Sequence, residues 1–377
     1  MKALRVWAVA RKETLHVVRD PRSLGMAIAI PILLLILFGY VLTLDVDDVP
    51  LVVWDQSGSP ASRELLSRFA ASRYFSVRGT AADERAIGHA MDSREALIGL
   101  IIPADFARRL EASRPVAVQA IVDGSDANTA TLAITYANAV VSGYAQNVTL
   151  EHLRRNGTAA APTALELRPR VWYNPDMQSR NAIVPGLTAV IMMVIAAMLT
   201  SLTVAREWER GTMEQLISTP VKGSELVLGK LIPYFAIGML DVLIAVLMGE
   251  FLFEVPLRGS VALVFAMAAV FLAGALALGM LISIAARNQL LATQLAMVTT
   301  FLPAFLLSGF MYAIANMPRP IQWATHLVPA RYFVALLRGI YMKGVGLRIL
   351  GLEAGLLAAF GAAMVALAVL RFKKRLS

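Results

Sequence analysis

The stretch "AIVPGLTAVIMMVIAAMLTSLTV", residues 182–204, contains no charged side chain and indicates the fold class of the whole chain. A helix needs about 20 apolar residues to cross the hydrocarbon core of a bilayer, and this stretch has that length. The rest of the chain has the same character, because 58% of its 377 residues are hydrophobic, only 16% are charged and the mean hydropathy is +0.64. These values exclude an ordinary soluble domain and indicate a membrane protein.

Six apolar runs have about the length of a membrane-spanning helix. They are residues 26–44, 182–204, 231–253, 261–285, 294–312 and 347–370. The first run follows basic residues, as a secretory signal does, but it is longer than a usual signal core and no small-residue cleavage pattern follows it. We therefore interpret it as a retained anchor, and the sequence predicts a polytopic α-helical membrane protein with six transmembrane helices.

Basic residues gather on one side of the predicted membrane. Residues 1–25, the connection 205–230 and the tail 371–377 are rich in Lys and Arg, whereas the opposite short connections hold few. Because short cytoplasmic loops carry an excess of Lys and Arg, both termini are predicted to be cytoplasmic. The net charge of +9 then reflects insertion and contact with membrane lipid, not nucleic acid, since the sequence has no separate basic domain.

Residues 45–181 form the one large hydrophilic region, and a cytoplasmic N-terminus places it on the outer side of the membrane. Short strand-like runs start at Val49 ("VPLVVWD"), Ala96 ("ALIGLIIP") and Val116 ("VAVQAIVDGSD"). They alternate with helical stretches such as "SPASRELLSRFAAS" and residues 127–155. The pattern predicts a small α/β extracytoplasmic domain inserted between the first two transmembrane helices. Without cysteine, its core alone must hold it together.

The sequence offers little catalytic chemistry. Its four histidines fall in different predicted compartments, and without cysteines they predict no metal site. The stretch "GSELVLGKL" from Gly223 resembles a phosphate-binding loop, but its glycine spacing is wrong and Leu231 replaces the magnesium-binding Ser or Thr. We therefore predict no catalytic residue, no enzyme activity and no cofactor in this chain.

The charged connection 205–230, "AREWERGTMEQLISTPVKGSELVLGK", has two interpretations. A charge run usually faces water, so the simpler one is a solvated loop. The alternative is a short helix at residues 213–218. Gly211 interrupts the preceding run, Thr212 begins a capping-box pattern and Pro220 ends a helix.

Residues 1–25 are predicted to form an amphipathic helix on the cytoplasmic membrane surface. Apolar side chains, among them Leu4, Trp7 and Leu15, share one helical face, and basic side chains surround it. Such helices often serve only as lipid anchors, and the residues alone leave that interpretation open.

The last outer connection, residues 313–346, is too polar and too rich in proline for a span. Its aromatic and aliphatic side chains nevertheless suit a membrane interface, so we predict short re-entrant helices there. The residues singled out in this loop are Trp323, His326, Pro329 and Arg331.

Asp241 lies near the middle of the third predicted span. A carboxylate at that depth costs about 2.5–3.5 kcal/mol on insertion scales, so something must offset it. One interpretation places Asp241 on a translocation pathway or at a dimer interface. The other makes it a structural group that is protonated or hydrogen-bonded to Ser, Thr or Gln on a neighbouring helix.

Three long blocks carry a family resemblance. They are residues 174–221, "NPDMQSRNAIVPGLTAVIMMVIAAMLTSLTVAREWERGTMEQLISTPV", residues 307–344, "LSGFMYAIANMPRPIQWATHLVPARYFVALLRGIYMKG", and residues 122–140, "VDGSDANTATLAITYANAV". In these blocks the chain resembles the permease, or membrane subunit, of ATP-binding-cassette exporters of the ABC-2 type. The similar branch has a large external domain after the first helix, and the resemblance runs from end to end of the chain.

The resemblance implies a transport subunit of the bacterial inner membrane without a nucleotide site of its own. A second permease copy or a related permease would pair with it, and separate cytoplasmic ATPase subunits, which hold ATP and magnesium, would drive alternating access. The charged connection would then be the coupling helix that contacts the ATPase, and the N-terminal helix a connecting helix. The residues assigned to coupling are Arg206, Glu207, Glu209, Arg210, Gly211, Thr212, Met213 and Glu214, and those assigned to the connecting helix are Trp7, Arg11 and Lys12.

The substrate stays open. An apolar bundle favours a hydrophobic or amphipathic molecule moved out of the cytoplasm or the inner membrane, and participation of a periplasmic adaptor is not decided. A membrane-anchored sensor would need a cytoplasmic output domain, for which no cytoplasmic segment is long enough. An ATPase-independent channel or a membrane enzyme would need pore-lining charges or a catalytic set.

Overall fold

The computed structural model describes residues 2–41, 48–112, 114–155, 173–174 and 178–372. The chain divides into two compact units, one formed by Met1–Thr43 with Arg170–Ser377 and the other by Leu44–Pro169. The end of the first predicted span, most of the predicted lead back to the membrane and most of the tail 371–377 lie outside the described residues.

The unit Leu44–Pro169 has the predicted α/β fold. Its sheet has the strand order β2-β1-β3-β4, in which β1, β2 and β3 are parallel and β4 pairs antiparallel with β3. The strands are β1 (Val49–Asp55), β2 (Phe75–Thr80), β3 (Ile98–Ile102) and β4 (Gln119–Val122). The strands predicted from Val49, Ala96 and Val116 are confirmed as β1, β3 and β4, whereas β2 is not among the predicted strands.

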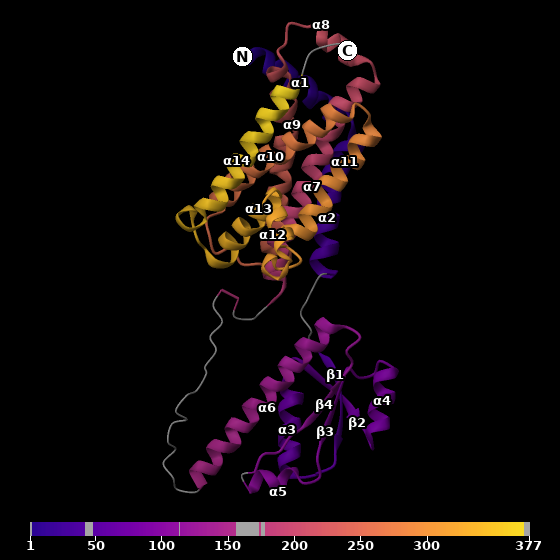
Figure 1. The fold of residues 1–377 in the computed structure, drawn as a ribbon, viewed down its shortest axis with the longest axis vertical. Coiled ribbons are helices and arrows are strands. Elements are labelled where there is room, and N and C mark those ends of the chain that lie inside the picture. The colour runs from indigo at the N-terminus through magenta and orange to yellow at the C-terminus, as the bar shows by residue number, and fades with distance from the viewer. Residues whose placement is uncertain (1, 42–47, 113, 156–172, 175–177, 373–377) are drawn as a thin grey trace. The chain divides into compact units, whose positions relative to one another are not determined.

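Helices cover both faces of this sheet (Figure 1). Side chains alternate between the faces of a strand, so Leu51 of β1 lies on one face and Val52 on the other. The Leu51 face packs against α3 (Pro60–Ala71), α5 (Phe106–Glu111) and α6 (Ala127–Arg155). The Val52 face packs against α4 (Glu84–Asp92). Two apolar cores therefore hold the unit together.

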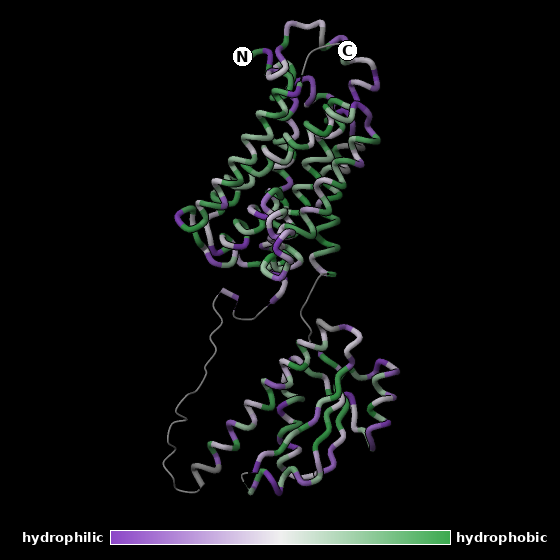
Figure 2. The backbone as a smooth tube through the Cα atoms, viewed as in Figure 1, coloured by the Kyte–Doolittle hydropathy of each residue, from purple (hydrophilic) through white to green (hydrophobic). Residues whose placement is uncertain are grey.

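The other unit is a helical bundle with a single extended apolar core. Among the described residues, five helices are long and apolar enough to cross a membrane: α7 (Arg180–Glu209), α9 with its π-helical end (Gly223–Leu252), α10 (Val261–Ala286), α11 (Gln289–Leu307) and α14 (Leu347–Arg371). Helix α2 (Pro21–Val41) adds the shorter apolar segment Ala27–Val41. Figure 2 shows apolar residues along most of the length of these helices, with hydrophilic residues near the bundle ends.

Short elements occupy the two ends of the bundle (Figure 1). At one end lie α1 (Ala3–Arg19), α8 (Thr212–Ser218) and the end of α14. At the other end lie α12 (Arg319–Thr325) and α13 (Pro329–Arg338), followed by the π-helical turn Gly339–Lys343. A 3-10 turn at Ile314–Asn316 precedes them. The short helices predicted for residues 313–346 are therefore present.

Two bundle helices extend into the charged connection 205–230. Helix α7 continues to Glu209, and α9 begins at Gly223, well before the predicted start at Leu231. The first turn of α9 is stabilised by Glu225, whose Oε2 accepts the Lys222 amide at 3.0 Å. The connection therefore consists of the end of α7, α8 and the first turns of α9, and Lys230 lies inside a helix.

Candidate functional site

Helix α8 is a seven-residue helix between α7 and α9. It begins after Gly211, which has a φ of 67° in the left-handed region that glycine adopts without steric cost. The predicted capping by Thr212 is wrong, because Gly211 is the capping residue and the Thr212 hydroxyl donates to the Glu207 carbonyl at 3.4 Å. Met213 is buried in the bundle core, whereas Glu214 is exposed. Helix α8 is therefore anchored on one side and presents polar groups on the other.

A buried ion network fastens α1 to α7 and α9. The Lys230 ammonium donates to Glu13 Oε1 at 2.6 Å and lies 3.0 Å from Glu207 Oε1. The same Glu207 oxygen accepts the Lys12 ammonium at 3.1 Å. Lys230 is 1% exposed, Glu13 4% and Glu207 8%. Two carboxylates thus balance two ammonium groups, as buried charges require.

A second attachment joins the start of α1 to the start of α9. The Lys2 amide donates to Glu225 Oε1 at 2.8 Å, and the Arg5 guanidinium lies 3.8 Å from Glu225 Oε2. Arg5 also donates to the Pro220 carbonyl at 2.6 Å, in the connection that follows α8. These contacts bond α1 to the segment after α8, and the Lys12–Glu207 pair bonds it to α7 before α8.

Helix α1 has two different apolar faces. Val9, Ala10 and Val17 are buried with Glu13 on the face toward α9, where Gly229 lets the helices approach closely: a Cβ on that glycine would lie 2.7 Å from Val9. The opposite face, which carries Leu4 and Trp7, is exposed, with Trp7 at 65%. The face predicted to contact the membrane is thus exposed. A second face, not predicted from the sequence, packs against the bundle.

The end of α7 is also bonded to the turn between α10 and α11. The Glu209 carboxylate accepts both the backbone amide and the side-chain amide of Gln289, and the Arg206 guanidinium donates to the Gln289 side chain at 3.3 Å. Arg287 lies over the Trp208 ring at 4.8 Å from its centroid. Of the predicted coupling residues, Arg206, Glu207 and Glu209 therefore hold the bundle together, whereas Arg210 and Glu214 are exposed without a side-chain partner among the described residues.

Two members of the network, Glu13 and Lys230, are absent from the sequence-based candidates. A signal for Glu13 exists, because it shares a helical face with Val9, Ala10 and Val17, and an acidic residue on an apolar face calls for a partner. Lys230 directly precedes an apolar run, a position typical of a basic residue at the end of a membrane-spanning helix. Arg11, the remaining connecting-helix candidate, is exposed.

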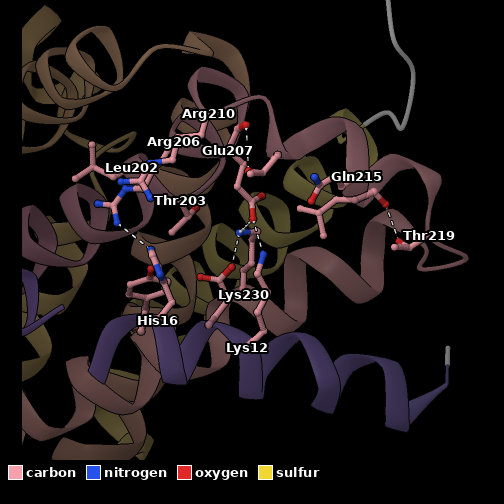
Figure 3. Close-up of a pocket in the computed structure, with 14 residues that line it drawn as sticks. Lys12, His16, Leu202, Thr203, Arg206, Glu207, Arg210, Gln215, Thr219 and Lys230 are labelled. Atoms are coloured by element: carbon pink, nitrogen blue, oxygen red, sulfur yellow. Dashed lines mark hydrogen bonds and ion pairs between the residues drawn. The ribbon is translucent and has the colours of Figure 1, made fainter. Parts of the chain in front are cut away.

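The joint formed by α1, α7, α8 and α9 contains a cavity of about 430 Å³ that is partly open to the surface (Figure 3). His16 and Arg206 lie together on one side, with 3.3 Å between His16 Nε2 and the guanidinium. Lys12, Glu207 and Lys230 lie together as well, and α8 contributes Gln215 to the wall. The cavity is thus walled by charged groups next to the candidate coupling helix.

At the other end of the bundle, Arg338 of α13 ties separate segments together. Its guanidinium donates to the carbonyls of Ala182 at 3.3 Å, Gly309 at 2.9 Å and Phe310 at 3.0 Å. These carbonyls belong to the first turn of α7 and to the turn after α11. Arg338 therefore adds a donor to a helical carbonyl at Ala182 and pairs two carbonyls in a non-helical turn. Arg338 is not among the sequence-based candidates.

The four predicted loop residues play different parts, and two of them, His326 and Arg331, line a pocket together with Arg338. Trp323 is 76% exposed on α12, and Pro329 is buried at the start of α13. The Arg331 guanidinium donates to the Thr325 hydroxyl. His326 is exposed, and its carbonyl accepts the Tyr332 hydroxyl at 2.8 Å. Hydrogen bonds between residues of the loop therefore hold it together.

Asp241 lies inside α9 and is 2% exposed. Neither of its carboxylate oxygens has a hydrogen-bond partner among the described residues. Among the described residues, the predicted hydrogen bond from a Ser, Thr or Gln of a neighbouring helix is therefore not found. No described neighbour offsets the free-energy cost of burying this carboxyl.

Comparison with known proteins now decides the family. The family model described as "ABC-2 family transporter protein" matches residues 21–370. The chain belongs to the ABC-2 transporter family. This ABC-2 permease is 39% identical to "Probable multidrug ABC transporter permease YbhS" of Escherichia coli K12 over 374 residues, which cover 99% of this chain and 97% of the relative.

Two further relatives come from the same organism. "Probable multidrug ABC transporter permease YbhR" is 31% identical to this ABC-2 permease over 348 residues, or 92% of each chain. "Inner membrane transport permease YhhJ" is 26% identical over 333 residues, which cover 86% of this chain and 85% of the relative. The predicted resemblance is therefore confirmed over nearly the full length.

We predict that Lys230→Met destabilises this ABC-2 permease by about 3–5 kcal/mol, because Glu13 and half of the Glu207 pairing are left buried without a counter-charge. Adding Glu13→Leu should restore most of the loss, since Glu207 keeps Lys12. The measurement is the thermal unfolding midpoint in detergent, with the exposed Lys222→Met as the control. Equal midpoints for Lys230→Met and Lys222→Met would contradict the network.

Proposed function

We propose that this chain is the transmembrane permease subunit of an ATP-driven exporter in the bacterial inner membrane, with ATP hydrolysis carried out by separate cytoplasmic ATPase subunits. The family match and the names of the relatives, two of which are called multidrug permeases and one an inner membrane permease, support this proposal. ATP and magnesium would bind to the partner, and this chain would supply the membrane pathway.

The buried network around Lys230 is the observation that carries the coupling mechanism. Helix α8 is short and joined to α7 through only Arg210 and Gly211, so a push on α8 would reach α7 directly. Glu207 and Lys230 then pass it to α1 and α9, because these helices share buried charges that separate only at high cost. A contact on α8 would therefore tilt several helices together, as alternating access requires.

The exposed groups of the joint would contact the ATPase. Arg210 and Glu214 would form charge-assisted hydrogen bonds in a cleft of the partner. Arg206, Glu207 and Glu209 would position α7, since each is already bonded within the bundle. Gly211 would provide the turn, and Met213 would seat α8 on the bundle core.

The proposed topology has six spans with both termini in the cytoplasm. Five helices meet the length and hydropathy needed to span, and the sixth span would include Ala27–Val41. The α/β unit would then be extracytoplasmic, and the loop 313–346 would be re-entrant at the outer surface. This assignment rests on the excess of Lys and Arg in residues 1–25, 205–230 and 371–377.

The proposed substrate is hydrophobic or amphipathic, in line with the multidrug names of two relatives. The permease would function as a dimer, with a second copy of itself or with a related permease. A periplasmic adaptor protein is a further candidate partner. Asp241 would lie on the pathway, since its carboxyl is buried without a described partner; its burial within the single chain does not favour the other interpretation, the dimer interface. No observation in the described residues favours a channel or a membrane enzyme over this proposal.

The first test exchanges the charges that face the partner. We expect Arg210→Glu with Glu214→Lys to lower ATPase co-purification and substrate-stimulated ATP hydrolysis roughly tenfold, because reversed charges meet like charges in the partner cleft. Arg371→Glu, an exposed residue at the same end of the bundle, is the matched control. Membrane insertion should not change in either variant. Wild-type ATPase co-purification and ATP hydrolysis in the double variant would show that α8 is not the coupling helix.

Asp241 can be tested by separating stability from transport. Replacing it with Leu removes a carboxyl that has no described partner, so the thermal midpoint should stay level or rise. Export should fall in Asp241→Leu and be partly kept in Asp241→Asn, which retains polar atoms. If the Leu variant exports at the wild-type rate, Asp241 has no role on the pathway.

The topology predicts which surfaces a membrane-impermeant maleimide reaches in intact cells. The chain has no cysteine, so a single introduced one reports its own side. Ser67→Cys on α3 should be labelled without permeabilisation, whereas Ser218→Cys on α8 should be labelled only after it. The reverse pattern would show that the proposed orientation is inverted.

A further inference from the structure

A second cavity, of about 410 Å³ and partly open to the surface, lies at the end of the bundle where α12 and α13 are found (Figure 1). Its volume falls in the range of about 300–1,000 Å³ that is usual for small-molecule sites. Two helices in contact with each other, α13 and α14, supply its charged side chains. A single stripe of α13 lines it with Arg331, Val334, Ala335 and Arg338. One face of α14 lines it with Leu352, Glu353 and Leu356.

The two arginines of this α13–α14 cavity carry positive charges that no carboxylate balances among the described residues. Arg338 donates to three backbone carbonyls, and Arg331 donates to the Gln322 carbonyl and the Thr325 hydroxyl. All of these acceptors are neutral. A guanidinium group has five N–H donors, so both arginines keep donors for a further partner. Phosphate and carboxylate are the partners that such donors favour.

The acidic group of the cavity lacks a donor. Glu353 is the one acidic residue of α14, lies near the start of that membrane-spanning helix and is half-buried. No hydrogen bond or ion pair joins it to Arg331, to Arg338 or to any other described residue. Ionisable residues in membrane-spanning segments usually face a cavity or the bundle interior and take a partner there. An ammonium group of a ligand, with its N–H donors, would be such a partner.

Apolar surface continues from the cavity along α14. Leu352 and Leu356 line the cavity and are also exposed to the surroundings of the bundle. Most of α14 lies on the outside of the bundle, since only 17% of its apolar window is buried. A molecule bound at Glu353 can therefore lay an apolar part against these leucines. Charged groups in the cavity with apolar surface beside it fit an amphiphile.

We propose that the α13–α14 cavity binds an amphiphile with a zwitterionic headgroup, in which a primary ammonium group accompanies a phosphate or a carboxylate. Arg331 donates to the anionic group, the ammonium donates to Glu353, and the apolar part lies along Leu352 and Leu356. Arg338 keeps its bonds to the three carbonyls and adds positive charge. A membrane phospholipid, phosphatidylethanolamine, has this chemistry, and so does a transported compound of the same class. The second source rests on the proposed transport function.

The first measurement is lipid retention by the full chain in non-ionic detergent, followed by native mass spectrometry. The probes are equal amounts of phosphatidylethanolamine, phosphatidylcholine, whose ammonium has no N–H donor, and phosphatidylglycerol, which has no ammonium. Wild type should retain phosphatidylethanolamine in preference to both. Glu353→Gln should lower its retention roughly tenfold, as expected for a lost hydrogen bond to a charged group, and should remove the preference over phosphatidylglycerol. Arg331→Gln should lower the retention of both lipids, because both carry the phosphate.

The matched controls are Glu250→Gln and Arg348→Gln, which remove the same charges from exposed residues that do not line the cavity. Both should retain lipid as the wild type does. Thermal midpoints check the fold, and Glu353→Gln tests the site alone if Arg331→Gln unfolds. Equal retention of the three lipids by the wild type, or the same loss in Glu353→Gln and Glu250→Gln, would overturn the proposal.

The second measurement identifies the source of the ligand by the mass of what co-purifies from cells in the same detergent. Phosphatidylethanolamine would show a membrane lipid, and another zwitterionic amphiphile would show a compound on the export route. Either should be present with the wild type and lost with Glu353→Gln. Co-purification of neither contradicts the proposal. Neither measurement involves ATP hydrolysis or export, so a negative result leaves the proposed transport function standing.

Discussion

The bundle depends on one buried ammonium group. Lys230 lies in the first part of α9 and is held between Glu13 of α1 and Glu207 of α7, all of them nearly inaccessible to water. Each charge is tolerated only because the others are present, so the three helices cannot separate without stranding one of them. The close approach at Gly229, the bonds of Glu225 and the buried Met213 all lie on the same helices, α1, α8 and α9, around this network.

Continuous apolar segments in the sequence made most of the architecture predictable. Apolar runs mark the helices because lipid requires them, and the strands β1 and β3 stand out as almost continuous apolar segments between helical stretches. The strand β2, "FSVRGT", does not stand out, because it lies at the sheet edge and most of its residues are exposed. Its place comes from pairing with β1, which a sequence window does not contain.

The candidate site was predictable only in part, for a related reason. The charged connection and the short helix within it follow from local signals such as Gly211 and Pro220. The role of Glu207 does not, since the same carboxylate could face water or a lysine that is distant in the sequence. By hydropathy Lys230 would be placed at the end of a span. Only its partners on α1 and α7 explain how α9 carries that charge inside the bundle.

At the opposite end of the bundle, several bonds between segments depend on the one side chain of Arg338. One guanidinium serves three carbonyls from two segments of the chain, so moving α13 away deprives all three of their donor in a single event. A single substitution at Arg338 therefore removes, all at once, the side-chain bonds that join α13 to the start of α7 and to the turn after α11.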